Sequence, residues 1–510
     1  MIKKFKLYII LIAMAVSSAS CLDKMPEDGI PFDKSLQTVS DINLAVIGIY
    51  DAFRSNYLYS GNLTLLPDIQ TDLVYGVNGN TNIYGDIWRW KEIKPTNTDI
   101  EAVYGALYDV INRCNFMLDR ADAVRKKTTD DKDLDKLDQC CGEAYFARAL
   151  AYSELVKLFC KAYESDEDAA GQLGVILSQH YLGDETMRRA SLKDSYQFIL
   201  DDLDRAAELL ELEEDFNTDT QGTLYDSIYF NEYTVHALRA RVLLYMKRWD
   251  EAIKYATKVI DSGYYYLSSC TQAATSSASY YKYMWTNDFS TEAIWKVGFT
   301  INSYGGALGQ VFANYDYSTL RPDYVPATWA VNLYDMNDLR VSAFFQSFTT
   351  GYSHGLTWPL LIKYFGNESF TNYNILHVSM PKVLRLSEQY LIRAEAYVQR
   401  DQPDYGKAGS DISVLRTARY SSYGGSTSLN KENAMDVIEQ ERVKELYMEG
   451  FRLHDLKRWH KGFERTPQDQ SLSNGSSLKV EKDDPLFVWP IPQHELDAPG
   501  SEIEPNESNK

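Results

Sequence analysis

The sequence is poor in the residues that build metal and redox centres. It has 510 residues but only six cysteines and seven histidines. No Cys-x-x-Cys and no His-Glu-x-x-His occurs, and the histidines lack ligand spacing, which disfavours zinc and dithiol sites. Five cysteines follow Cys21, an odd number, so no disulfide is assigned, and those in apparent helices are expected to be small buried apolar side chains. The sequence therefore predicts no catalytic residue, no metal site and no cofactor.

Positive charge is also in short supply. The chain carries 52 Lys and Arg against 72 Asp and Glu, a formal net charge of -20. Such a surface repels phosphate backbones, so nucleic acid is not expected as a partner. Asp131, Asp133 and Asp135 begin like a calcium loop, but Lys136 and Gly142 stand where Gly and Glu are required. A solvated run of charge is therefore favoured over a calcium site.

Long apolar runs are missing after the first twenty residues. Lys3, Lys4 and Lys6 precede an apolar core at residues 7–16, and a run of small residues ends at Cys21. That core is too short for a permanent membrane span, which predicts a signal peptide over residues 1–20. The ending resembles a bacterial lipobox, in which the cysteine is acylated, so Cys21 is the predicted lipidation site. Residues 21–40, which include Pro26 and Gly29, are expected to form a tether.

Apolar residues at helical spacing dominate the rest of the chain. They predict helices over residues 45–53, 99–124, 134–163 and 193–210, the first capped by Thr38 or Ser40. Ala240 and Ala252 are twelve residues apart, as are Ala396 and Ala408. Small residues at this spacing are typical of tetratricopeptide helix pairs. The prediction is a mainly α scaffold with minor β structure, such as a short strand within residues 291–299.

The C-terminal third contains two charged helical segments, residues 383–397 and 441–459. In the second segment, spacings of three predict ion pairs of Arg442 with Glu445 and of Glu449 with Arg452. Alternating signs of this kind are more typical of a paired structural face than of acid–base chemistry.

These two segments carry a resemblance to a known family. The R-L-x-E-x-Y-L-I-R-A-E-A and E-R-x-x-E-L-x-x-E-G-x-R-x-x-D-L-x-R-W patterns closely resemble the C-terminal signature of the SusD/RagB family of outer-membrane nutrient-binding lipoproteins. Residues 338–340 resemble its D-x-R element, and residues 487–492 resemble its closing W-P-I-P. The family's Q-N-P-G-Y ending is missing.

The resemblance implies a single SusD-like domain over residues 41–510. Its helical scaffold would comprise residues 41–61, 96–263 and 382–460, with loop-rich binding regions at 62–95 and 264–381 and an extension at 461–510. It also implies a lipid-anchored protein on the cell surface, in the outer membrane. Such a protein captures a glycan, or less often a peptide, and passes it to a SusC-like TonB-dependent transporter without catalysing a reaction.

The two loop-rich regions are rich in aromatic residues and asparagine. Trp88 and Trp90 would project to one side of an extended loop and form a two-ring platform for sugar units, with Asp72 and Asn80 contacting hydroxyl groups. The full predicted ligand set is Trp88, Trp90, Asp72, Asn80, Tyr84, Trp285, Tyr315 and Tyr317. If the two tryptophans belong to the core, the site is expected among Tyr283, Trp285, Tyr304 and Trp358.

Two further classes of protein compete with this interpretation. A surface glycoside hydrolase needs two carboxylates about 5 to 10 Å apart, a feature that sequence spacing alone does not reveal. A tetratricopeptide adaptor that binds protein tails conflicts with the exported start at residues 1–21.

Overall fold

The computed structural model describes residues 34–510, apart from 92, 182, 184–186, 211–226, 317–318, 353–354 and 467–476. The predicted signal peptide, Cys21 and most of the predicted tether lie outside the described residues, and so does Tyr317. In the part of the chain that is described, no helix is both long and apolar enough to span a bilayer.

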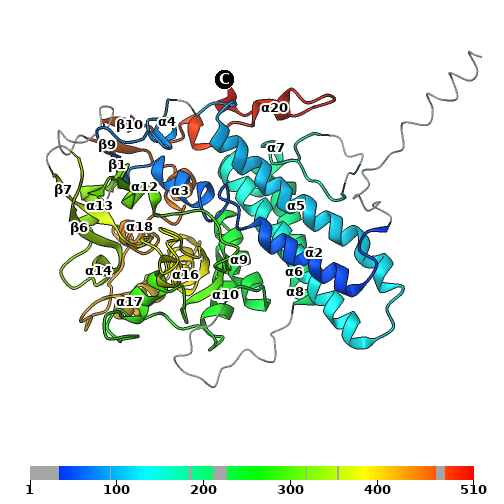
Figure 1. Ribbon diagram of the computed structural model, residues 1–510, viewed down its shortest axis with the longest axis horizontal. Coiled ribbons are helices and arrows are strands. Elements are labelled where there is room, and N and C mark those ends of the chain that lie inside the picture. Colours follow the sequence, from blue (N-terminus) through cyan, green and yellow to red (C-terminus); the bar gives the residue numbers. More distant parts are fainter. Residues whose placement is uncertain are drawn as a thin grey trace, which may run out of the picture.

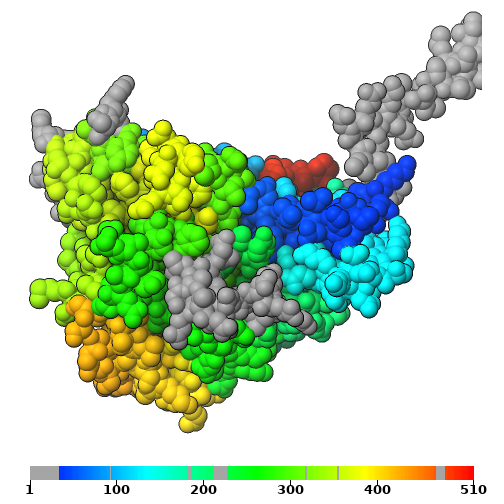
Figure 2. Space-filling view, turned by 60° about the horizontal axis from the view of Figure 1, so that its bottom comes forward, coloured from blue at the N-terminus to red at the C-terminus, as the bar shows by residue number. Residues whose placement is uncertain are grey.

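One end of the molecule is a bundle of long helices. It consists of α2 (Val39–Ala52), α5 (Thr98–Arg125), α6 (Asp131–Phe159), α7 (Asp166–Gly171) and α8 (Leu192–Leu209). Figure 1 places these helices at one end, the β6–β7 ribbon at the other, and α9, α10 and α16 between them. The space-filling view in Figure 2 has the same division, with blue and cyan segments at one end and yellow-green segments at the other.

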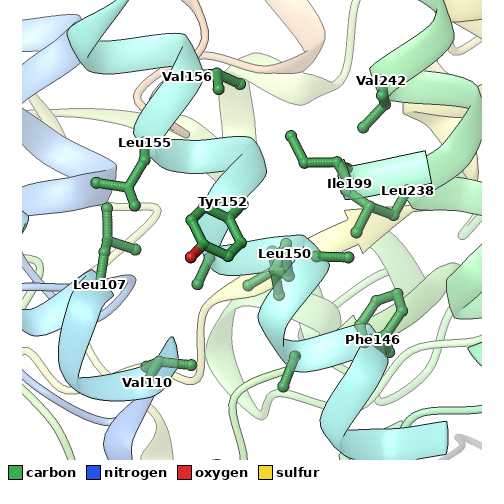
Figure 3. Packing of buried hydrophobic residues seen from close by; sticks show 14 of the residues in the cluster. Leu107, Val110, Phe146, Leu150, Tyr152, Leu155, Val156, Ile199, Leu238 and Val242 are labelled. Carbon is green, nitrogen blue, oxygen red and sulfur yellow. The ribbon is translucent and has the colours of Figure 1, made fainter. Parts of the chain in front are cut away.

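Helix α6 is the centre of the bundle because its C-terminal half is buried on nearly all sides. In Figure 3, Leu155 of α6 faces Leu107 of α5, while Ile199 of α8 lies beside Leu238 of α9. The helix starts are fixed locally, since Thr38 forms a capping box with Asp41 at α2, as the sequence predicts. Helix α6 ends at Phe159, earlier than expected, and Asp131, Asp133 and Asp135 lie in its first turns.

Two helix pairs form the centre of the fold. They are α9 (Glu232–Tyr245) with α10 (Trp249–Ile260), and α16 (Leu386–Gln399) with α17 (Tyr405–Arg419). Helix α10 packs against both α9 and α16. Ala252, Ala256, Ala396 and Ala408 are buried, which lets the helices approach closely as in tetratricopeptide repeats. The predicted mainly α, tetratricopeptide-like fold class is confirmed.

The other end consists of short elements and two-stranded antiparallel ribbons. The ribbons in the described residues pair β1 (Val74–Gly76) with β5 (Tyr324–Pro326), β2 (Ala293–Lys296) with β8 (Lys382–Arg385), β3 (Tyr315–Asp316) with β4 (Thr319–Leu320), β6 (Phe345–Thr349) with β7 (Thr357–Leu361), and β9 (Phe463–Arg465) with β10 (Leu478–Val480). The short helices are α3 (Asn62–Ile69), α4 (Gly85–Trp88), α11 (Tyr280–Thr286), α12 (Gln310–Ala313), α13 (Thr328–Val331), α14 (Arg340–Phe344) and α15 (Glu368–Thr371).

Two of these elements differ from the sequence-based expectation. Residues 62–69 were expected to be loop but form α3, in which every residue is buried. A helix buried on all sides shows no apolar stripe, so periodicity misses it. Residues 383–385 were expected to be helical but belong to β8, whose four residues are all buried. A short buried strand has no alternation that distinguishes it from the helix that follows.

The second charged segment is not one helix either. Helix α18 (Ala434–Glu445) and helix α19 (Arg452–Arg458) are separated by a turn with Met448 at φ 58° and Gly450 at φ +84°. Gly450 suits this turn, because the left-handed region favours glycine. The chain ends with η3 (Pro485–Phe487), α20 (Gln493–Leu496) and η4 (Glu507–Asn509). Near that end, Asn506 donates hydrogen bonds to the carbonyls of Phe159 and Trp489.

The turn between α18 and α19 changes the ion pairs. Arg442 pairs with Asp455 at 2.7 Å, not with Glu445. Arg452 pairs with Asp72 at 2.9 Å and Glu439 at 2.7 Å, not with Glu449. The predicted Glu449–Arg452 pair is wrong because Glu449 lies in the turn, and a spacing of three brings side chains together only within one continuous helix. Arg442 and Glu445 do share α18, but their predicted pair is also wrong, because Arg442 binds Asp455 while Glu445 binds Arg340, Arg385 and Arg419.

Candidate functional site

A buried network of charged residues joins the two ends of the fold. Its centre is Glu445 of α18, which accepts hydrogen bonds from Arg340 at 3.0 Å, Arg385 at 2.9 Å and Arg419 at 2.9 Å. All four residues are essentially inaccessible to solvent. The guanidinium groups also bind Glu292, since Arg385 and Arg419 each reach its Oε1 atom, at 2.7 and 2.8 Å. The charges are paired and dry, so the network holds segments together rather than binding a ligand.

The D-x-R element belongs to this network. Asp338 and Glu441 accept hydrogen bonds from Arg340 at 2.6 and 2.7 Å. Burial by itself raises the pKa of Glu441, but the charges of Arg340, Lys444 and Arg416 outweigh burial and lower the pKa to about 2. Glu441 is therefore ionised at neutral pH.

We expect the melting temperature to fall as the pH is lowered from 4.5, the ordinary value for Glu441, towards about 2. A carboxyl group with a depressed pKa in the folded state stabilises the protein above its unfolded pKa, and this contribution is lost as the pH falls through the folded pKa. Circular dichroism melts between pH 6 and pH 2 would measure this loss. Glu441→Gln is the control, because it removes one titrating group and should make the profile less steep, while Glu445 and Asp455, whose pKa values are also lowered by neighbouring guanidinium groups, still contribute. A parent profile that is flat over this range would contradict the assignment.

Trp285, one of the predicted ligand residues, lies inside this network. Its side chain is buried, with the Lys363 ammonium 4.1 Å and the Lys382 ammonium 5.0 Å from the ring centre. Cations at these distances are attracted to the face of an indole. Trp285 is thus a structural partner of buried lysines and offers no exposed face to a sugar.

Trp88 and Trp90 do not form the expected platform. Trp88 ends helix α4, is 1% exposed, and donates a hydrogen bond to the Val74 carbonyl at 3.1 Å. Trp90 is half-buried against Phe463 and Phe487, with ring centres 5.6 and 5.3 Å away. The two indoles pack into different hydrophobic clusters. The platform geometry is wrong because this segment forms a helical turn, with Trp90 at φ 57°, instead of an extended loop.

The predicted polar contacts near these tryptophans are occupied within the protein. Asp72 is buried in the ion pair with Arg452. The half-buried Tyr84 donates a hydrogen bond to Asn62 Oδ1 at 2.9 Å. Asn80 is half-buried, and its side-chain oxygen accepts a hydrogen bond from the Asn82 amide at 2.9 Å. These three residues shape the loop but do not meet at one open surface.

Tyr315 is the exposed residue among the predicted set that the structure describes. Its ring stacks on His377, with centroids 5.8 Å apart and an interplanar angle of 18°. Burial lowers the pKa of His377, which favours the neutral imidazole at pH 7. The tyrosine ring therefore stacks on an uncharged ring. The ring of Tyr315 is held in place while it remains open to solvent.

Two further exposed tyrosines lie on the segment that carries His377 or pack against it. Tyr373 is 63% exposed, and its amide donates to the Phe370 carbonyl at 2.9 Å. Tyr304 is 46% exposed and lies 6.1 Å from the buried Phe370 ring. We refer to Tyr304, Tyr315 and Tyr373 as the tyrosine face, since residues 366–378 link all three.

Polar groups suitable for binding hydroxyls occur on the segments that carry or support these tyrosines. The exposed amide side chains on the same segments belong to Asn302, Gln310, Asn372 and Asn374. The supporting segments are fixed, because the Gly309 amide donates to the His377 carbonyl at 3.2 Å and the Asn367 amide donates to the Val378 carbonyl at 2.8 Å. Exposed aromatic rings beside amide groups can bind an apolar sugar face together with its rim of hydroxyls.

Sequence reasoning placed Tyr304 only in the second set of candidates and missed Tyr373. A signal was available, because residues 366–374 combine glycine, asparagine and tyrosine in the same way as residues 76–84. Trp358 and Tyr283, which the sequence also suggested, do not extend this face, because Trp358 is buried in the β6–β7 ribbon and Tyr283 is half-buried in α11.

In the described residues, no three His, Cys, Asp or Glu side chains gather as metal ligands, and all five cysteines after Cys21 are free and buried. Residues 351–355 have the Gly-x-Ser-x-Gly spacing of a serine nucleophile. They connect β6 to its antiparallel neighbour β7, whereas a nucleophile elbow joins a strand to a helix. Ser353 and His354 lie outside the described residues.

Two family models match separate parts of the chain. The model described as the SusD family matches residues 346–502. The model described as starch-binding associating with outer membrane matches residues 25–225. The first match contains strand β7, both signature segments and the W-P-I-P element. The second match contains the helical bundle.

One curated protein is similar to about a third of this chain, whereas solved structures are similar to most of it. SusD-like protein P2 of Formosa agariphila is 24% identical over 162 residues, which cover 31% of this chain and 30% of that protein. A SusD superfamily protein from Bacteroides thetaiotaomicron has 23% identity and a TM-score of 0.76, over 92% of this chain and 99% of that chain. A SusD-like carbohydrate binding protein from Bacteroides vulgatus has 20% identity and a TM-score of 0.72, over 91% and 97%. At these identities the likeness to the solved structures concerns the fold.

Proposed function

Because the chain belongs to the SusD family, we propose that it is a cell-surface lipoprotein that captures a glycan and delivers it to a SusC-like TonB-dependent transporter. In this proposal, residues 41–510 act as one binding unit and Cys21 carries the acyl anchor. The protein holds its ligand without making or breaking covalent bonds.

The tyrosine face is the observation that carries the glycan-binding part of the proposal. Three exposed rings lie on residues 366–378 or pack against them, exposed amide side chains occur on the same segments, and backbone hydrogen bonds fix these segments. Supporting segments that are already ordered reduce the conformational entropy lost when a ligand binds, which favours affinity. A sugar also suits the surface because the rings contact its apolar face while the amides bind its hydroxyls.

A binding screen tests this function directly. The purified protein would be run in native gels that contain one polysaccharide each, with an unrelated acidic protein as the control for charge. Slower migration with at least one polysaccharide is the expected result. Incubation with the same polysaccharides should release no new reducing ends. Release of reducing ends would favour a surface glycoside hydrolase instead.

The membrane anchor gives a separate prediction. We expect Cys21→Ala to lose association with the outer membrane while keeping its melting temperature, because acyl chains anchor a protein without a spanning helix. Cell fractionation of a strain that lacks the partner transporter would measure this, with Cys270→Ala as a matched cysteine control. If Cys21→Ala still partitions with outer membranes in that strain, Cys21 is not the anchor.

A further inference from the structure

The chain between the end of α10 and strand β2 forms a hollow that none of the three tyrosines of the tyrosine face lines. It has a volume of about 390 Å³ and is lined by residues that include Tyr266, Leu267, Ser269, Gln272, Tyr280 and Thr291. This volume lies within the range of about 300 to 1,000 Å³ that is typical of small-molecule pockets. We refer to it as the Tyr266–Tyr280 hollow.

Backbone hydrogen bonds fix the walls of this hollow. The Tyr266 amide donates to the Thr291 carbonyl at 2.9 Å, and the Thr291 hydroxyl donates to the Tyr266 carbonyl at 3.0 Å. On the opposite wall, the Tyr280 amide donates to the Gln272 carbonyl at 3.0 Å. Because the backbone is used in this way, the two phenol rings and the Gln272 side chain are the groups that a ligand can meet. The hollow is preformed, which lowers the cost of binding.

The chemistry of the lining points to one class of ligand. Two tyrosines provide flat rings and phenol hydroxyls, and the Gln272 amide provides a donor and an acceptor, while the hydroxyls of Ser269 and Thr291 are used within the protein. Leu267 is the one aliphatic residue of the lining, and a single aliphatic side chain offers too little apolar surface to bind a lipid chain. No Lys, Arg, Asp or Glu lines the hollow, so it has no partner for a carboxylate or a sulfate group. A neutral molecule rich in hydroxyl groups fits these walls.

The hollow and the tyrosine face lie at opposite ends of α11. Tyr280, the first residue of this helix, lines the hollow. Asn287, just after its end, donates a hydrogen bond at 3.3 Å to Glu368, which begins α15 within residues 366–378. A helix of seven residues is about 10 Å long, so this helix separates the hollow from the segment that supports the tyrosine face by about that length.

From this arrangement we propose that the Tyr266–Tyr280 hollow is a second sugar subsite, which selects a neutral sugar unit of the glycan bound at the tyrosine face. This inference rests on the proposed glycan-binding function and extends it. The tyrosine face supplies stacking surface, whereas the hollow supplies a preference for uncharged units. An acidic sugar unit entering the hollow would lose hydration without gaining a cationic partner.

The test is calorimetric titration of the purified full chain with neutral hexasaccharides of glucose (maltohexaose and cellohexaose), mannose and xylose, and with hexagalacturonate as the acidic probe. Tyr266→Ala/Gln272→Ala is compared with the parent, with Tyr304→Ala/Tyr373→Ala and with Ser276→Ala, an exposed control in the same loop. We expect the hollow variant to bind a neutral hexasaccharide at least about fivefold more weakly, at an unchanged melting temperature, because it lacks one ring and one amide.

The possible results separate the two proposals. If the hollow variant binds every neutral probe as tightly as the parent while Tyr304→Ala/Tyr373→Ala binds weakly, the subsite is wrong and the proposed function stands. If the parent binds only hexagalacturonate, the neutral subsite is again wrong and glycan binding stands. If the parent binds none of the hexasaccharides, the result contradicts both the neutral subsite and the proposed glycan binding. Equal weakening of the neutral and acidic probes by the hollow variant would overturn the preference for neutral units.

Discussion

The Glu445→Ala variant is expected to be less stable than the parent by about 3 to 5 kcal/mol, a typical cost of breaking a buried ion pair. The reason is that Arg340, Arg385 and Arg419 share this carboxylate in a region that water does not reach. Removal of the carboxylate leaves three buried cations with one anion fewer. Because Arg340, Arg385 and Arg419 come from different parts of the chain, the loss should loosen the junction between the helical and loop-rich ends.

Urea unfolding followed by circular dichroism would measure this change. Asp436→Ala is the matched control, since Asp436 lies exposed on the same helix, α18. Glu449→Ala should also be destabilised, but through Lys363 and Arg385, its partners in the fold, and not through Arg452. A Glu445→Ala variant as stable as Asp436→Ala would show that the network contributes little to folding.

The Tyr304→Ala/Tyr373→Ala variant is expected to lose most of its affinity for the glycan identified in the screen. Each lost ring should weaken binding by about 1 to 3 kcal/mol, by analogy with stacking of bases and exposed aromatic pairs. Both side chains are exposed, so their removal should change the melting temperature little. Calorimetric titration gives the affinity, and a thermal melt checks the fold.

Two control variants distinguish loss of a binding contact from loss of any exposed ring and from unfolding. Tyr229→Ala removes a tyrosine that is 54% exposed and packs on Tyr50 of α2, at the other end of the fold, and it should bind like the parent. Trp88→Ala should be destabilised by about 3 to 5 kcal/mol, the usual cost of removing a large core side chain. If the tyrosine variant binds normally, the tyrosine face is not the site. If Trp88→Ala is stable but does not bind, the site lies in the 62–95 region.

The sequence predicted the scaffold well because its signals are local. Long amphipathic helices such as α5 and α8 show their buried stripe in the order of residues, and Thr38 and Asp41 define a helix start within four positions. The signature segments also carried the family resemblance, since the residues of the buried network form a dense and recognisable pattern of charge. What this pattern could not reveal was which acid meets which base.

Ring exposure was harder to predict. Trp88 and Tyr373 both stand in polar, glycine-containing stretches, yet Trp88 is 1% and Tyr373 is 63% exposed. The difference arises from distant contacts, because Arg465 lies 4.4 Å from the Trp88 ring centre and β9 approaches from a part of the chain nearly 400 positions away. No spacing rule links residues so far apart.

The sequence by itself determined the helical scaffold, the repeat-like helix pairs, the family and the acidic charge, because each is written in short-range periodicity or a contiguous motif. Only the tertiary structure decided the partners of Glu445, Glu449 and Arg452, the burial of Trp88 and Trp285, and the exposure of Tyr304 and Tyr373. The physical reason is that burial and ion pairing depend on which segments meet in space. The turn at Gly450, for example, brings Arg452 to Asp72 instead of Glu449, although the sequence around Gly450 keeps the charge spacing of a helix.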